Sequence, residues 1–269
     1  RPTGERLRSR AMAAQSPARL ATAEFVGTAL VVVGGPGMLV LGGPEVGTLG
    51  VALGFGASLA IAIGVLGAVA NPMFSLALWF AKAISLKEAI ADWIGQLLGG
   101  IFGAAILWGL TDMDGLTAGF NGWQRGNGLD AGVDLGVTTG PFAELGVVIA
   151  AELVFAVLLV VVLLAAIKDH ASNATTAAFV GATATLSTLL LLGISGSGLN
   201  PARSLGMAIF ADADPHPLGQ VWVFLVIPLV AAFAGLLVWL AIDEATIDDT
   251  VFDDTVLEDL AEAAGDLVD

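Results

Sequence analysis

The chain has 269 residues, of which 57% are hydrophobic and 13% charged, and its mean hydropathy is +0.88. Ordinary soluble domains hold about 45–50% apolar residues, so this composition excludes a soluble enzyme with a polar shell and predicts a membrane protein. The sequence has no cysteine, no tyrosine and two histidines, which excludes disulfides and leaves almost no donors for a metal. We therefore expect no enzyme, no catalytic residues, no metal, no cofactor and no nucleic-acid partner.

The charges gather at the two ends of the chain. Residues 1–20 carry five of the ten basic residues and no apolar run, which predicts a basic cytoplasmic segment and not a signal peptide. Residues 243–269 carry eleven carboxylates and no Lys or Arg, so this stretch supplies −11 of the net charge of −15. Such a block is typical of a solvated tail. The nearly neutral part between them, residues 21–242, is predicted to be the membrane domain.

Six stretches of this central part are long enough to cross a bilayer, which takes about 20 apolar residues. They are residues 22–41, 47–66, 86–110, 143–167, 174–193 and 219–242. Two further apolar pieces, 71–81 and 200–210, each open with Asn-Pro, and helices of about ten residues cover about 15 Å, half of a bilayer. Asn as the cap and Pro at the first position favour helices there. We predict an all-α membrane protein with six transmembrane helices and two re-entrant half-helices.

The two halves of the chain repeat each other. Glu24 precedes Asn71 by 47 residues, and Glu152 precedes Asn200 by 48, within matching local sequences. Three spans in each half force the halves into opposite orientations, which makes the arrangement an inverted repeat. The predicted halves are residues 21–110 and 142–242, joined by residues 111–141.

Basic residues predict the orientation in the membrane. Lys82 and Lys87 follow the second span, Lys168 follows the fourth, and the arginines of the N-terminal segment precede the first. These places share one side, which the positive-inside rule assigns to the cytoplasm. We expect a multi-pass protein of the cell membrane with both termini in the cytoplasm and residues 111–141 outside.

Two half-helices that enter from opposite sides bring their N-termini together at the centre of the membrane. Each helix dipole carries about half a positive charge there, so cations are repelled, whereas the amides of Asn71 and Asn200 can donate to the oxygen of a solute. The loops before them are expected to expose unpaired carbonyls to a wet cavity. Donors and acceptors together favour the passage of a polar, uncharged molecule. The expected carbonyls are those of Gly67, Ala68, Val69, Ala70, Gly196, Ser197 and Gly198.

Arg203, Glu24 and Glu152 are charged residues of the predicted membrane segments for which we expect a role. Arg203 lies three residues into the second half-helix, where a charge costs about 2.5–3.5 kcal/mol on insertion scales. We expect it to face a watery lumen, to bind solute oxygens there and to oppose cations and protons. Glu24 and Glu152 are expected to brace the loops before the two Asn-Pro motifs by accepting N–H groups, with a proton relay as the alternative.

At these residues the sequence resembles the aquaporin and glyceroporin family of membrane channels, over about residues 20–242. The resemblance rests on Ala23-Glu24-Phe25-Val26-Gly27-Thr28, on Gly95-Gln96, on Glu152 and on the second Asn-Pro-Ala signature at Asn200, Pro201 and Ala202. It implies a homotetramer in the lipid bilayer with one pore per subunit, passing water or small neutral solutes.

The sequence departs from the family at the first signature. It reads Asn71-Pro72-Met73, and Val69 stands where a histidine is common. The loop before it is about four residues shorter than usual if Phe55 belongs to the selectivity region of the second span. Met73 is larger and more flexible than the usual alanine.

The family's narrowest ring, carried across by spacing from Arg203, implies a filter of Phe55, Thr188, Ser197 and Arg203. Thr188 stands where water-selective members usually have His, which favours a wider ring, whereas Ser204 stands where glycerol-conducting members usually have Asp. The resemblance implies a passive channel for water that excludes protons and ions. Passage of small neutral solutes stays open, and a facilitator for glycerol or urea is the nearest alternative.

Two other classes of protein also stay open. An ion-coupled secondary transporter would use Glu24 or Glu152 for ion coupling, and its accumulation of solute would depend on an ion gradient. A non-conducting structural membrane protein on the same scaffold would show negligible permeability in vesicles.

Overall fold

A computed structural model describes residues 16–111, 113, 116–123, 143–168 and 172–243. Most of the predicted N-terminal segment, most of the predicted connector and nearly all of the acidic tail lie outside these residues. The described part is helical except for loops and one isolated bridge between Leu116 and Ala211.

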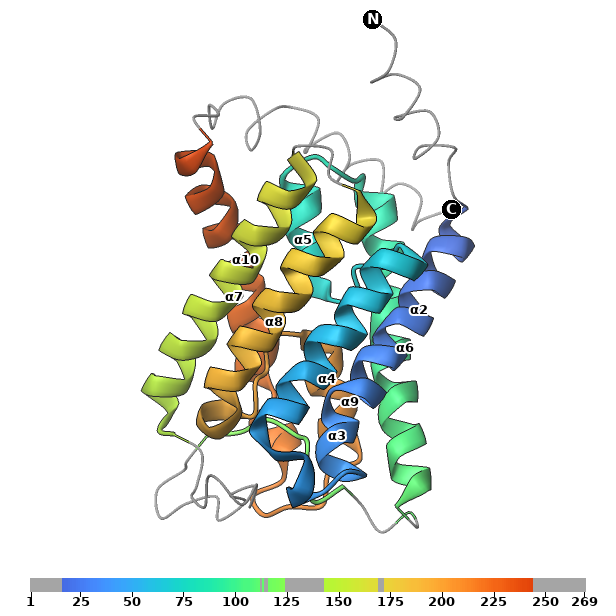
Figure 1. Ribbon diagram of the computed structural model, residues 1–269, viewed down its shortest axis with the longest axis vertical. Helices are drawn as coiled ribbons and strands as arrows, with labels where there is room; N and C mark the ends of the chain where they lie inside the picture. The colour runs from blue at the N-terminus through green and yellow to red at the C-terminus, as the bar shows by residue number, and fades with distance from the viewer. Residues whose placement is uncertain (1–15, 112, 114–115, 124–142, 169–171, 244–269) are drawn as a thin grey trace, which may run out of the picture.

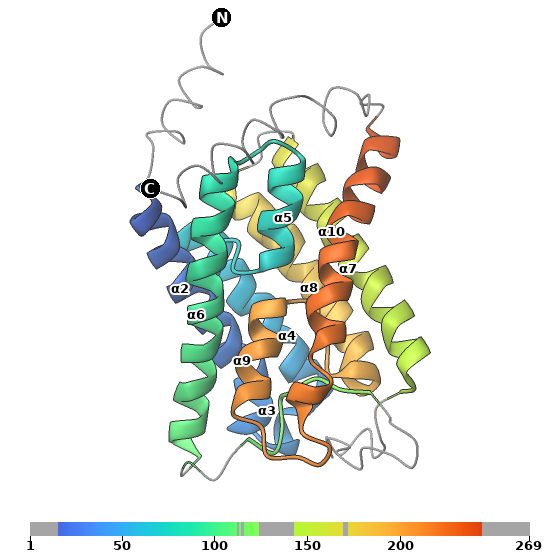
Figure 2. The same ribbon diagram turned by 180° about the vertical axis from the view of Figure 1, so that it is seen from behind.

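Six helices in the described part are long and apolar enough to cross a membrane, which confirms the predicted number. Figures 1 and 2 show them standing side by side along the long axis of the molecule. The first span consists of α2 (Pro17–Gly34) and α3 (Pro36–Val40), and the second consists of α4 (Gly47–Ile61) and the π-helical turn η2 (Ala62–Leu66). The other spans are α6 (Leu86–Leu110), α7 (Leu145–Lys168), α8 (Asn173–Ser195) and α10 (Trp222–Ile242), and short 3₁₀ turns lie at η1 (Pro44–Val46) and η3 (Pro217–Gly219).

The two predicted half-helices are present as α5 (Pro72–Phe80) and α9 (Pro201–Ile209). Each begins with proline behind an extended asparagine cap, and the side chain of Asn71 accepts from Met73 N at 3.0 Å. In Figure 2, α5 lies in the upper half of the molecule and α9 in the lower half, so each covers part of its depth. The start of α2 and the end of α10 lie at the same end of the bundle (Figure 1).

Glycines let α6 approach its neighbours closely. A Cβ atom built on Gly95, Gly99 or Gly103 would come within 2.9 Å of a backbone carbonyl oxygen of α2. On another side of α6, a Cβ on Gly206 of α9 would lie 2.3 Å from the carbonyl oxygen of Gly100. Backbone contact on both sides leaves no room for side chains, so α9 is held directly against α6.

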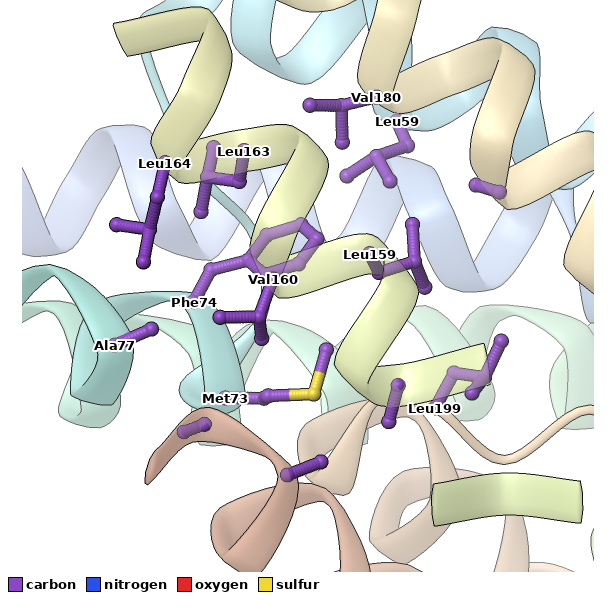
Figure 3. Close-up of a cluster of buried hydrophobic side chains, with 14 of the residues drawn as sticks. Leu59, Met73, Phe74, Ala77, Leu159, Val160, Leu163, Leu164, Val180 and Leu199 are labelled. Carbon is purple, nitrogen blue, oxygen red and sulfur yellow. The ribbon is translucent and has the colours of Figure 1, made fainter. Parts of the chain in front are cut away.

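The largest buried cluster lies between α5, α7 and neighbouring helices. Figure 3 shows Met73 and Phe74 of α5 beside Leu159 and Val160 of α7. Met73 is fully buried. The residue that departs from the usual Asn-Pro-Ala motif therefore fills the apolar core with its side chain, while its backbone N–H takes part in the cap of α5.

Candidate functional site

The two Asn-Pro motifs are joined by reciprocal hydrogen bonds at the meeting point of the half-helices. Asn71 Nδ2 donates to Leu199 O at 3.0 Å, and Asn200 Nδ2 donates to Ala70 O at 2.7 Å. Each asparagine thus caps its own half-helix with its oxygen and holds the opposite loop with its nitrogen. An amide NH₂ carries two hydrogens, so each asparagine keeps a second one that a solute oxygen can accept.

Some of the carbonyls that were expected to be unpaired already accept hydrogen bonds from the protein. Ala70 O accepts from Asn200 Nδ2 at 2.7 Å, Gly196 O accepts from Arg203 at 3.0 Å, and Gly198 O accepts from Asn200 N. The expectation is wrong for these three, because the short loops fold against the asparagines and the arginine. A carbonyl oxygen has two lone pairs, so each still has one acceptor position.

The loops leave their helices in the same way in both halves. Gly67 ends η2 with φ of 68°, and Gly196 ends α8 with φ of 79°. This left-handed conformation favours glycine and turns the chain from the span into the loop. Pro72 and Pro201 then begin the half-helices.

Glu24 holds the first loop from inside α2. Its two carboxylate oxygens accept from Val69 N and Ala70 N, each at 2.7 Å, and Gln96 Nε2 donates to it at 2.8 Å. The side chain is 4% exposed. Two backbone N–H groups that no helix pairs are thereby satisfied.

Glu152 holds the second loop in the corresponding way from α7. It accepts from Gly198 N at 2.7 Å, from Leu199 N at 2.8 Å and from Ser195 Oγ. The side chain is fully buried. The matching bonds of Glu24 and Glu152 show that the repeat extends from sequence to hydrogen bonding.

Asp92 of α6 is a buried carboxylate that the sequence analysis did not single out. Ser75 Oγ donates to Asp92 Oδ2 at 3.1 Å, and Gln96 Nε2 lies 2.9 Å from Ser75 Oγ. A chain of polar contacts therefore links Asp92 with Glu24 and fastens α5 to α6. The rule that marked Glu24, a carboxylate inside an apolar span, would also have found Asp92.

The four residues of the expected filter form two pairs, and the members of each pair contact each other. Thr188 Oγ1 is 3.0 Å from Ser197 Oγ, and Arg203 Cζ lies 5.3 Å from the centroid of the Phe55 ring. Arg203 Nη2 also donates to Gly196 O at 3.0 Å, next to Ser197. The guanidinium is fully buried, and its Nε has no hydrogen-bond partner among the described residues. That N–H is therefore an unused donor.

Asn121 fixes the guanidinium from the chain between the two halves. Its Oδ1 accepts from Arg203 Nη1 and, at 2.8 Å, from Ser204 Oγ, while its Nδ2 donates to Ser195 O at 3.2 Å. Asn121 is 3% exposed. No local pattern marks Asn121 for this role, because a lone Asn in a Gly-rich connector is ordinary and its partners lie more than 70 residues away.

Comparisons with known proteins point to one family. The model of a family described as "Major intrinsic protein" matches residues 11–239. "Aquaporin Z" from Brucella melitensis biotype 1 is 35% identical over 234 residues, which cover 81% of this chain and 95% of that protein. "Aquaporin Z" from Photorhabdus laumondii subsp. laumondii is 31% identical over 229 residues, which cover 81% of this chain and 94% of that protein.

A solved structure has the same fold. The X-ray structure of the aquaglyceroporin from Plasmodium falciparum superposes with a TM-score of 0.61 and 20% sequence identity, and it covers 83% of this chain and 96% of that chain. At this identity the likeness concerns the fold alone.

Proposed function

Since the chain belongs to the major intrinsic protein family, we propose that it is a passive channel for water and small neutral solutes that excludes ions and protons. Members of this family are channels and not enzymes, and six apolar helices place this one in a membrane. Both relatives named above are called Aquaporin Z, which favours water as a permeant. The observation that carries the proposal is the pair of asparagines that cap opposed half-helices and hydrogen-bond across their junction.

The junction of the half-helices supports selection by charge. The N-termini of α5 and α9 meet there, and each brings about half a positive charge from its helix dipole. The carboxylates of Glu24 and Glu152 are turned to the N–H groups of the two loops. A neutral solute meets amide donors and carbonyl acceptors instead.

We assign the filter to Phe55, Thr188, Ser197 and Arg203. The small hydroxyl side chains of Thr188 and Ser197 contact each other. The other two members are the aromatic ring of Phe55 and the guanidinium of Arg203 beside it. The hydroxyls and the Nε of Arg203 can replace the hydration of a polyol or urea, and the fixed charge opposes protons and cations. This composition supports a filter wider than one that admits water alone.

We further propose a homotetramer in the cell membrane with both termini in the cytoplasm. The resemblance implies one pore in each subunit, and the positive-inside rule gives the orientation. We also keep the proposed division into a channel domain of two repeats between a basic N-terminal segment and an acidic tail.

Stopped-flow light scattering on proteoliposomes tests the proposed function. Vesicles are exposed to gradients of an impermeant osmolyte, of glycerol and of urea. The protein should speed the shrinkage of vesicles in the impermeant osmolyte. It should also speed their re-swelling in glycerol, in urea or in both. Negligible permeability to water, or accumulation of solute that depends on an ion gradient, would contradict a passive channel.

Thr188→His should narrow the filter. An imidazole is larger than the hydroxyl side chain that it replaces beside Ser197, so less room is left beyond one water molecule. We expect glycerol and urea fluxes to fall more than the water flux, measured in the same gradients. Equal reductions of all three would show that residue 188 does not line the narrowest part.

Ser197→Cys should make the pore sensitive to mercurials. The chain has no cysteine, so the wild type offers no thiolate and should be insensitive. Water flux through the variant should fall on addition of a mercurial and recover with a reducing thiol. Ser58→Cys is the matched control, because Ser58 is buried within the second span and bonds to Gly54 O. A well-folded Ser197→Cys channel that stays open would contradict the assigned filter.

A further inference from the structure

We propose that Gly35, at the break in the first span, sets the position of the Phe55 ring and thereby the width of the filter. Gly35 itself touches no solute, so it is a positioning residue for specificity. The inference rests on the proposed function, because the ring limits passage only if the pore conducts.

The first span is interrupted where it passes Phe55. Helix α2 ends at Gly34 and α3 begins at Pro36, with Gly35 between them at φ of −92° and ψ of −85°. Proline lacks an N–H and disfavours helical geometry in the residue before it, which explains the break. The φ of Gly35 lies outside the left-handed region, so the backbone conformation does not itself explain the glycine.

What requires glycine is the aromatic ring. A Cβ atom on Gly35 would lie 2.6 to 2.8 Å from three atoms of the Phe55 ring, Cδ1, Cε1 and Cγ. A Cβ atom essentially never comes this close to a non-bonded carbon atom in a folded protein, so one partner would have to shift. Because the contact is with a rigid ring and not with the end of a flexible chain, the whole ring would move.

The neighbours of the ring limit where it can move. Phe55 is 8% exposed and packs in a cluster with Leu39, Val51 and Leu192. Protein interiors are close-packed, so these side chains leave little free space. Arg203, the residue of the proposed filter beside this ring, has its Cζ 5.3 Å from the ring centroid. A methyl group at position 35 would therefore push the ring toward the guanidinium and narrow the opening.

The test combines Gly35→Ala with a matched glycine and with removal of the ring. Gly37→Ala adds the same methyl group two residues further on, where it would meet the flexible end of Leu107 at 3.0 Å. The double variant Gly35→Ala/Phe55→Ala is compared with Phe55→Ala alone. Water, urea and glycerol permeabilities of the full chain are measured in proteoliposomes, with thermal unfolding as the check on folding.

We expect Gly35→Ala to lower the ratio of glycerol or urea flux to water flux about tenfold, the effect of about 1.4 kcal/mol on a barrier. Gly37→Ala should leave the ratio unchanged, and in the Phe55→Ala background Gly35→Ala should have no effect. If the wild type conducts water alone, the same pattern is expected in the water permeability. If Gly35→Ala folds poorly, removal of the ring should restore folding.

Three results would overturn the inference. They are an unchanged ratio in Gly35→Ala, the same fall in the Phe55→Ala background, and poor folding that Phe55→Ala does not rescue. In each case a conducting wild type leaves the proposed function standing. A wild type without conduction would remove the proposed function and this inference together.

Discussion

Replacement of Glu152 by alanine is expected to cause the largest loss of stability in the chain. Glu152 is fully buried and accepts from Gly198 N, Leu199 N and Ser195 Oγ. The serine can turn its hydroxyl elsewhere, but the two backbone N–H groups cannot. A buried unpaired donor costs about 1–3 kcal/mol, so the two together would cost about 2–6 kcal/mol. Thermal unfolding in detergent should occur at a clearly lower temperature than in the wild type.

The unfolding temperature of Glu152→Gln should lie between those of the wild type and the alanine variant. Its amide keeps one acceptor oxygen for one loop N–H, while its NH₂ group faces the other. Glu144→Gln is the matched control, because Glu144 is exposed at the start of the same helix, and it should leave both stability and conduction unchanged. If well-folded Glu152→Gln lost transport completely, the carboxylate would act in proton coupling and not in holding the loop.

Arg203→Val is expected to have the largest effect on selectivity. A fixed charge repels a cation at about 5 Å by about 3 kcal/mol at an effective dielectric constant of about 20, so its loss should raise proton and cation leak about a hundredfold. The smaller valine would also leave space in the filter and free Gly196 O as an acceptor, so larger solutes should pass. The measurement is proton flux into proteoliposomes under a pH gradient, beside water flux as the reference.

Asn121→Ala is the companion variant, because it keeps the charge and removes one of its supports. Without the Asn121 side chain, the guanidinium of Arg203 is still held by Gly196 O. Proton exclusion should therefore largely persist, while the ratio of solute flux to water flux shifts. If Arg203→Val stayed as proton-tight as the wild type, the charge would not be the barrier. If Asn121→Ala leaked as much as Arg203→Val, the position of the guanidinium and not its charge would carry the exclusion.

The spans and half-helices could be predicted because the bilayer imposes strong rules on sequence. The pieces predicted at 71–81 and 200–210 are helices at Pro72–Phe80 and Pro201–Ile209, since Asn-Pro marks a start and the apolar length marks the depth. The repeat also placed the two carboxylates near the loops. The family resemblance, by spacing from Arg203 for Thr188 and Ser197 and by the likeness of the second span for Phe55, selected residues that contact each other in pairs, Thr188 with Ser197 and Arg203 with Phe55.

The remaining features depend on contacts that are distant in sequence. Asn121 reaches Arg203 across 82 residues, and no local pattern shows which polar residue of a loop will fold back. The carbonyl of Ala70 was wrongly expected to be unpaired, because its partner, Asn200, belongs to the other half of the chain. Met73 points into the core, which the helix position alone did not reveal. Gly35 carries no signal until the ring beside it is seen.

Passage of water without protons can be measured in a single experiment on vesicles that contain a pH-sensitive dye. The wild-type protein is reconstituted, and the vesicles receive a hyperosmotic step under an imposed pH gradient, beside empty vesicles. We expect the protein to speed shrinkage greatly while the internal pH changes no faster than in the empty vesicles. A protein-dependent proton flux comparable with that of a proton channel would contradict it.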